Sequence, residues 1–293
     1  MHESTVETAK ALRESEKAAL LTLLGDEDEA VYAAVRARLL SLGGSAREWL
    51  RPHQFSRNRL VAGRVSEILR QLDRDEADQR FSRFCLSHGE DFDLETAAWL
   101  LAQTAYPDIN VEGYTAMLDE FAGELRSRIA LYRRGNQILG RINDFLFREQ
   151  GFAGNLDGED EPDHFYLNRV VDRRAGNATS LSLLYAVIAR RLGLPVAGVD
   201  LAGHFLCRYQ TAAEEIYIDA FHHGRLLSRA DCVHYLIRNR CDVKDNYLSP
   251  VRPRYWLYRL CEQLSELYRR RGETPEFERV SRYLAMIHVR VLT

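Results

Sequence analysis

The sequence predicts a mostly helical α+β protein that carries one small antiparallel sheet. Apolar residues recur at intervals of three and four over most of the first 150 residues, which is the period of an amphipathic helix. Three short strand-like runs follow in the second half, at residues 196–201, 204–209 and 215–220, and a hairpin-length loop separates the last two. Helices that surround one local group of strands are typical of the α+β class.

The composition is that of an ordinary globular protein. Of the 293 residues, 46% are apolar and 28% are charged, which is enough for a sizeable core. The formal net charge of −3 gives no reason to expect binding to nucleic acid or to an anionic membrane. No apolar stretch approaches the roughly 18 residues that span a bilayer, and the start of the chain lacks the pattern of a signal peptide. The five cysteines are scattered without a C-x-x-C pair, as in reduced proteins, so we expect a cytoplasmic location.

Residues 1–80 are predicted to form a HEAT-like helical region. The apolar positions of one helix, from Val31 to Leu42, recur 30 residues later from Val61 to Leu72. A constant offset of this kind indicates stacked helical hairpins, and the segment that begins at Leu23 resembles a bacterial HEAT-like repeat. The alternative is two ordinary amphipathic helices. A further helical segment is expected over residues 81–150.

The second half changes in character. A domain over residues 151–235 combines a strong helix at residues 180–192 with the three strand-like runs. Residues 236–293 are expected to form a helical tail, because their apolar pattern predicts one antiparallel pair of helices. That pair resembles a single helical-repeat unit of the tetratricopeptide kind.

The predicted hairpin carries residue types that support acid–base chemistry. If its turn is centred near residues 211–212, His204 lies directly opposite Asp219. The same register places Arg208 opposite Glu215, which is a favourable charge pair. A carboxylate beside one imidazole nitrogen orients the ring and raises its basicity. The alternative is a partly buried histidine that is satisfied by a neighbouring aspartate.

Several motifs around this hairpin follow one another in a recognisable order. They comprise residues 151–155 (GFAGN), 166–176 (YLNRVVDRRAG), 180–185 (SLSLLY), 189–195 (ARRLGLP), 203–206 (GHFL) and 218–221 (IDAF). This order resembles the transglutaminase-like superfamily, and more closely its SirB-type subgroup, the transglutaminase-like core 2 family. The resemblance covers about residues 92–236. It implies a transglutaminase/papain-like domain in which a cysteine at a helix start meets a histidine and an aspartate on adjacent strands.

The resemblance places Ala178 where active members of the superfamily carry the nucleophilic cysteine. The Gly-x-Cys motif of those members corresponds to residues 176–178, and counting back about fifteen residues from Gly193 reaches the same position. Alanine has no nucleophile. His204 and Asp219 are therefore interpreted as the catalytic pair of the superfamily, retained here as a vestige without its nucleophile.

Two hydroxyls near the same helix start are candidate substitutes for the nucleophile. Thr179 and Ser180 have the residue type of a weak nucleophile that needs a well-aimed base. Each step along a helix turns the side chain by roughly 100°, so both point away from the direction of position 178, and capping of the helix is the alternative role. Cys207 lies three positions from His204 in a strand and is expected to face the other side of the sheet, in the core.

No metal and no cofactor are predicted. His222 and His223 follow Asp219, but no acidic or thiol partner is expected at ligand spacing. The chain has no glycine-rich phosphate-binding motif and no H-E-x-x-H motif. Basic pairs such as Arg190 and Arg191 are interpreted as solvated helix faces.

We therefore expect a pseudoenzyme that serves as a protein-interaction or regulatory module. The missing cysteine and the flanking helical units motivate this hypothesis, and the expected partner is another protein. One alternative is a hydrolase or acyltransferase that uses Thr179 or Ser180 with His204 and Asp219. Another is a purely structural module in which that pair belongs to the core. The oligomeric state is left open.

Overall fold

A computed structural model of the chain describes residues 12–155, 161–241 and 245–288. The chain divides into two compact units, one made of residues 1–79 and 104–108 and the other of residues 80–103 and 109–293. Residues 1–11 of the predicted HEAT-like region lie outside the described residues. The last few residues of the predicted C-terminal helix do so as well.

The first unit is helical around one apolar core. Its elements are α1 (Glu14–Leu24), α2 (Glu29–Ser41), α3 (Gly44–Leu50), the 3₁₀ turn η1 (Arg51–Phe55) and the beginning of α4 (Arg59–Ser87). The side chain of Asp28 caps α2 by accepting a hydrogen bond from the backbone of Ala30. The apolar positions that recur with the 30-residue offset, among them Val35 and Val65, are buried in the same core. The short helix α3 and the turn η1 lie in the sequence between α2 and α4, the two helices that carry these positions. The HEAT-like repeat therefore stays a prediction.

The second unit joins many helices to a small sheet, which confirms the mostly helical α+β class. Its helical elements are the end of α4, most of α5 (Leu94–Ala105), α6 (Val111–Ile129), α7 (Gly135–Asn143), the π-helical turn η2 (Asp144–Glu149), η3 (Pro162–His164), α8 (Leu167–Arg173), α9 (Ala178–Arg191), α10 (Arg229–Arg238), η4 (Asp245–Leu248), α11 (Pro253–Arg271) and α12 (Thr274–His288). In the described parts of the chain, no helix is both long enough and apolar enough to cross a membrane.

Four antiparallel strands form the main sheet, in the order β3-β4-β5-β6. They are β3 (Val196–Leu201), β4 (His204–Gln210), β5 (Glu215–Asp219) and β6 (Arg225–Leu227). A separate parallel pair joins β1 (Ala153–Gly154) to β2 (Ala175–Gly176), directly before α9. The three strand-like runs predicted from sequence are all present. The strands β1, β2 and β6 were not predicted, because two or three residues show no alternating pattern.

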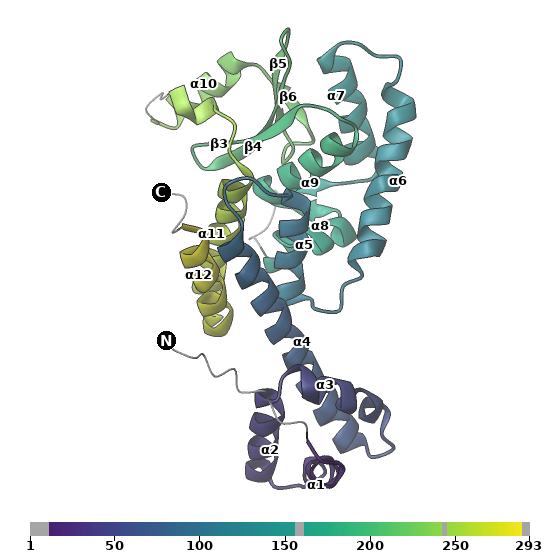
Figure 1. Cartoon of the computed structure of the whole chain (residues 1–293). Helices are drawn as coiled ribbons and strands as arrows, with labels where there is room; N and C mark the ends of the chain where they lie inside the picture. Colours follow the sequence, from purple (N-terminus) through teal and green to yellow (C-terminus); the bar gives the residue numbers. More distant parts are fainter. Residues whose placement is uncertain (1–11, 156–160, 242–244, 289–293) are drawn as a thin grey trace, which may run out of the picture. The chain divides into compact units, whose positions relative to one another are not determined.

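The main sheet has helices on both of its faces, with α9 beside β3 and β4 and α10 beside β5 and β6 (Figure 1). On the face toward α9, Cys207 donates a hydrogen bond from Sγ to the carbonyl oxygen of Ser182 in that helix, at 3.2 Å. On the opposite face, Leu206 and Tyr217 share a core cluster with Leu236 of α10. Because side chains alternate along a strand, each residue of β4 is assigned to one face or the other.

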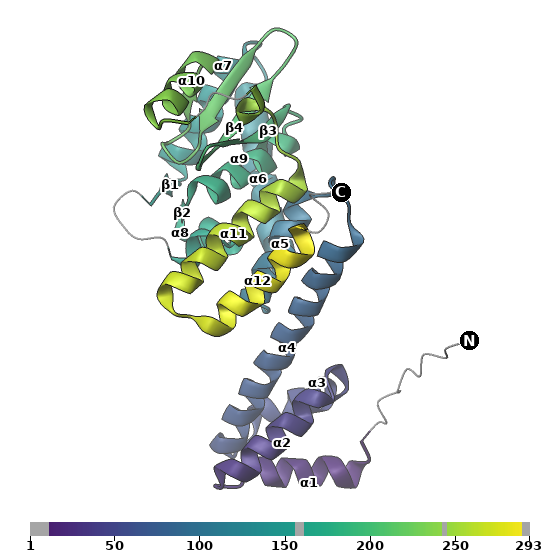
Figure 2. The same ribbon diagram turned by 90° about the vertical axis from the view of Figure 1, so that its left-hand side faces the viewer.

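The helices α11 and α12 form an antiparallel pair that lies side by side in both views (Figure 2). Gly272, in the left-handed conformation with φ of 70°, ends α11 and lets the chain turn back. The hydroxyls of Ser265 and Ser281 meet between the two helices at 3.1 Å. The expected pair is therefore present, while its likeness to a tetratricopeptide unit stays a prediction.

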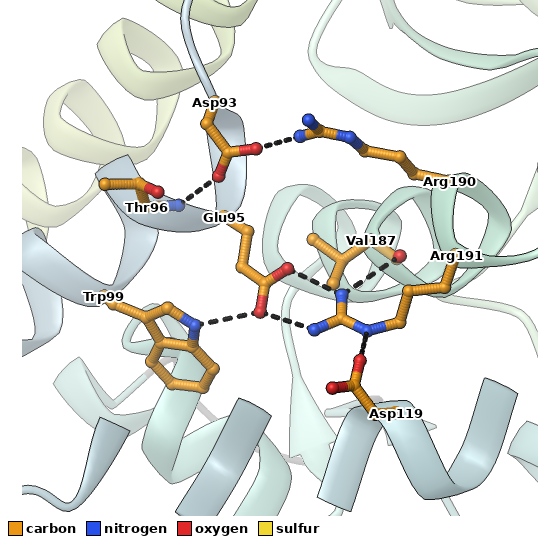
Figure 3. A network of polar contacts seen from close by, with 8 residues as sticks. All are labelled: Asp93, Glu95, Thr96, Trp99, Asp119, Val187, Arg190 and Arg191. Carbon is orange, nitrogen blue, oxygen red and sulfur yellow. Dashed lines mark hydrogen bonds and ion pairs between the residues drawn. The ribbon is translucent and has the colours of Figure 1, made fainter. Parts of the chain in front are cut away.

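A buried charge network holds the C-terminal end of α9 against α5 and α6 (Figure 3). Arg191 donates two hydrogen bonds to the carboxylate of Glu95, at 2.6 and 2.9 Å, and a third to Asp119 at 2.7 Å. The indole of Trp99 donates to the same glutamate at 3.1 Å. The side chain of Arg191 is 14% exposed, whereas that of Arg190 is 65% exposed. The interpretation of this arginine pair as a solvated face is thus wrong for Arg191, because helical rotation turns it toward α5.

Replacing Arg191 by alanine is expected to lower the free energy of unfolding by about 2 kcal/mol, since Glu95 would keep a largely buried charge without its partner. Arg190→Ala is the matched control and should cost less than about 0.5 kcal/mol, because its ion pair with Asp93 is exposed. Urea unfolding followed by circular dichroism measures both. Equal losses in the two variants would show that the network does not support the helix.

Candidate functional site

The β4–β5 hairpin places His204 beside Asp219, although in a different register from the predicted one. Arg208 lies opposite Tyr217 in the strand register, although its guanidinium still forms the predicted ion pair with Glu215, at 2.6 Å. The prediction was wrong by two positions, because the four-residue loop between the strands is centred one residue further along the chain than we assumed. A shift of two positions keeps every side chain on its face of the sheet. His204 therefore still reaches Asp219, now as a diagonal neighbour.

Three side chains meet at the end of this hairpin, and we call them the His–Asp–His cluster: His204, Asp219 and His222. Nε2 of His204 lies 3.0 Å from Oδ1 of Asp219. Nδ1 of His222 lies 2.7 Å from Oδ2 of the same carboxylate. One nitrogen or oxygen atom of each residue lies within 4.8 Å of those of the other two. The cluster thus concentrates two imidazoles and one carboxylate at a single point.

Asp219 is the buried centre of the cluster. Its Oδ1 also accepts a hydrogen bond from the backbone N–H of His222, at 3.2 Å, which fixes the plane of the carboxylate. Burial alone raises the pKa of Asp219, but the close polar contacts and charges of the two histidines outweigh it, so the pKa lies below its ordinary value. The carboxylate is therefore ionised at neutral pH and attracts a cation or a proton donor.

The His–Asp–His cluster opens into a cavity of about 470 Å³ on the α10 face of the sheet. The residues of α10 that line it include His234, Tyr235 and Arg238. The ring centroids of His204 and Tyr235 are 6.0 Å apart. The helix α9, which lies wholly within the described residues, contributes none of the cavity's lining.

The pleat of β4 explains why the cavity lies on that side. Phe205 and Cys207 face α9, where Ser182 donates a hydrogen bond to the carbonyl oxygen of Phe205 at 3.3 Å and accepts one from Cys207. His204 and Leu206 therefore point to the opposite face. The expectation that Cys207 lies in the core, on the other side of the sheet from His204, is confirmed.

The start of α9 is built as a capped helix end. Asn177 accepts a hydrogen bond from the backbone of Ser180 at 2.8 Å, and the Ser180 hydroxyl accepts one from the backbone of Asn177 at 3.0 Å. This reciprocal pair is a capping box. Ala178 is the first residue of the helix. A β-carbon at Gly176 would lie 2.7 Å from the Ser180 hydroxyl, so the cap leaves room only for glycine there.

Both candidate hydroxyls are buried and hydrogen-bonded within the fold. Ser180 Oγ donates to the carbonyl oxygen of His164 at 2.6 Å. Thr179 Oγ1 donates to the side chain of Gln263 at 2.9 Å. Neither residue is more than 1% exposed. In the hydrogen bonds of the described residues, neither hydroxyl meets the His–Asp–His cluster.

Four of the five cysteines are buried where they cannot act as nucleophiles. All five lie in the described residues and none is in a disulfide. Burial raises the pKa of Cys85, Cys207 and Cys232 to about 12, and it raises that of Cys261 well above its ordinary value. Those four thiols stay protonated at neutral pH and are inert. The fifth, Cys241, is partly exposed just beyond α10.

The role of His222 was not predicted from the sequence. No acidic partner was expected at ligand spacing, and this is wrong, because Asp219 lies three residues earlier and the turn after β5 folds the two side chains together. The pattern Asp-x-x-His at the end of a strand was a usable signal. The contribution of α10 to the cavity had no signal, since it depends on how that helix packs on the sheet.

Comparison with known proteins supports the resemblance seen in the motifs. A family model described as the transglutaminase-like superfamily matches residues 112–262. A UPF0162 protein of Xylella fastidiosa is 31% identical over 200 residues, which is 66% of this chain and 70% of that protein. A UPF0162 protein of Pseudomonas aeruginosa is 30% identical over 195 residues, or 64% of this chain and 69% of that protein.

A third relative has a different overall size. The F-box only protein 21 of Homo sapiens is 33% identical over 163 residues, which cover 52% of this chain but only 26% of that protein. No solved structure matches the chain significantly. The similar region is thus shared between bacterial proteins of comparable length and a quarter of a larger human protein.

Proposed function

Because the chain belongs to the transglutaminase-like superfamily, we propose that it is a non-catalytic, SirB-type member that works as a protein-interaction or regulatory module. In active members of this superfamily, a cysteine at the start of the central helix attacks an acyl carbon. Here the first residue of α9 is Ala178, whose methyl group cannot attack. The flanking segments that we interpret as HEAT-like and tetratricopeptide-like are of a kind that binds other proteins.

The observation that carries the proposal is the use of both nearby hydroxyls in structural hydrogen bonds. A hydroxyl is a weak nucleophile unless a base takes its proton. The Ser180 hydroxyl instead donates a hydrogen bond to the carbonyl oxygen of His164, and the Thr179 hydroxyl donates one to the side-chain oxygen of Gln263. Activating either one would break a buried hydrogen bond at the helix start, which costs about 1–3 kcal/mol before any chemistry begins.

The direction of His204 gives further support. Its ring lies on the α10 face, beside Tyr235. The helix α9 packs on the other face of the same strand, through Cys207. A base on one face is poorly aimed at a helix on the other.

The comparisons support an interaction role. The part similar to this chain makes up 26% of the human F-box only protein 21 and 70% of a UPF0162 protein of Xylella fastidiosa. A domain that recurs in proteins of different size is a transferable module, and binding of other proteins is the use that we propose for it here. The five cysteines without disulfides fit the cytoplasmic location that we propose for it.

A fluorophosphonate probe applied to the full chain is expected to label neither Thr179 nor Ser180, because both hydroxyls are buried and bonded. The labelled wild-type protein is digested, and mass spectrometry of its peptides locates any adduct, so no variant is needed. A known serine hydrolase serves as the positive control for the probe. An adduct on either residue that disappears in His204→Ala would overturn the non-catalytic proposal and favour a hydrolase or acyltransferase.

The interaction role predicts one defined protein partner in the cells from which the chain comes. Chemical crosslinking followed by quantitative mass spectrometry should recover that partner equally well with the wild type and with His204→Ala, since a scaffold does not need the imidazole. Arg190→Ala, which changes an exposed side chain, is the matched surface control. The scaffold role would be contradicted if no protein were enriched above a tag-only sample. It would also be contradicted if the partner were lost only with His204→Ala.

A further inference from the structure

We propose that the His–Asp–His cluster binds a divalent transition-metal ion of the Zn²⁺ or Fe²⁺ class. This inference goes beyond the proposed function, since it needs neither a nucleophile at α9 nor a protein partner. It starts from the convergence of His204, Asp219 and His222, whose donor atoms all lie within 4.8 Å of one another. The three residues come from β4, from the end of β5 and from the turn that follows.

The spacing of the donor atoms suits one small ion. Nitrogen and oxygen ligands lie about 2.1 Å from Zn²⁺, so neighbouring ligands around one ion are about 3–3.5 Å apart. The carboxylate of Asp219 is 3.0 Å from Nε2 of His204 and 2.7 Å from Nδ1 of His222. Both distances lie within a few tenths of an ångström of that spacing, and all three donor atoms lie within 4.8 Å of one another.

The chemistry of the donors points to a transition metal. Two imidazoles and one carboxylate form the facial triad of non-haem iron sites, and the same residue types hold catalytic zinc. Mg²⁺ and Ca²⁺ prefer sets made of oxygen ligands alone.

One buried atom in the cluster lacks a well-formed hydrogen bond. Nε2 of His204 is buried, and although it lies close to Asp219, it makes no hydrogen bond of acceptable geometry. A buried polar atom without a partner is costly and calls for an explanation. A metal ion in front of the imidazole would give Nε2 a better-aimed partner than the carboxylate contact at 3.0 Å, through the nitrogen lone pair.

The surroundings leave the ion accessible. His222 is half exposed, and the cluster faces the cavity of about 470 Å³ that is also lined by Arg225 and Arg238. Three protein ligands with an open position are typical of sites that exchange water or an anionic ligand, whereas structural zinc sites are closed by four. The backbone N–H of His222 holds Asp219 in place, which is the support that metal-binding carboxylates usually have.

Metal titration of tag-free, chelator-treated full-length protein tests the proposal. Isothermal titration with Zn²⁺ should give about one equivalent, and Co²⁺ should give the visible absorption of a bound ion with the same stoichiometry. His222→Ala removes a half-exposed side chain and so leaves the fold intact. It should weaken Zn²⁺ binding by at least about tenfold, as should Asp219→Asn.

The matched control is the neighbouring histidine, His223→Ala, which lies outside the cluster and should leave the affinity within about twofold. Failure of Zn²⁺ and Co²⁺ to bind saturably, or equal weakening by His223→Ala and His222→Ala, would overturn the proposal. Either result is independent of the probe-labelling experiment, so the metal site and the non-catalytic role can fail separately.

Discussion

The pairing of β4 with β5 is the constraint on which the rest of the site depends. The register of the two strands fixes which residues are neighbours, and the alternation of side chains fixes which face they occupy. Together they turn Cys207 toward α9 and His204 toward α10. The turn after β5 then folds His222 back onto Asp219. A change of one position in this register would exchange the two faces and separate the cluster.

The sequence was most informative where the pattern was local. The bounds of β3 and the helix α9 follow from short runs with a clear period, and the closeness of His204 to Asp219 survived an error of two positions because both registers share a face. The register itself depends on how the hairpin loop closes, which residue types alone did not fix. Burial of Arg191 beside Glu95 is a tertiary contact between segments almost a hundred residues apart, and no local pattern encodes it.

The start of α9 and the His–Asp–His cluster lie on different faces of the main sheet. At the start of α9, where the superfamily's active members carry a thiol, the polar groups of Asn177, Ser180 and Thr179 are engaged in capping and in buried hydrogen bonds. On the α10 face, ionisable groups converge beside a cavity. We therefore propose that the His–Asp–His cluster is a binding site in its own right and not the remainder of a Cys-His-Asp catalytic triad.

The central claim is that His204 is turned away from the start of α9, and a cysteine placed at position 178 tests it most directly. The rate of iodoacetamide alkylation of Ala178→Cys should be measured against pH, with and without His204→Ala. A helix start alone lowers a thiol pKa, so only dependence on the imidazole is diagnostic. The account predicts that the two pH profiles coincide. A thiol that reacts fast at neutral pH and loses this reactivity with His204→Ala would contradict it.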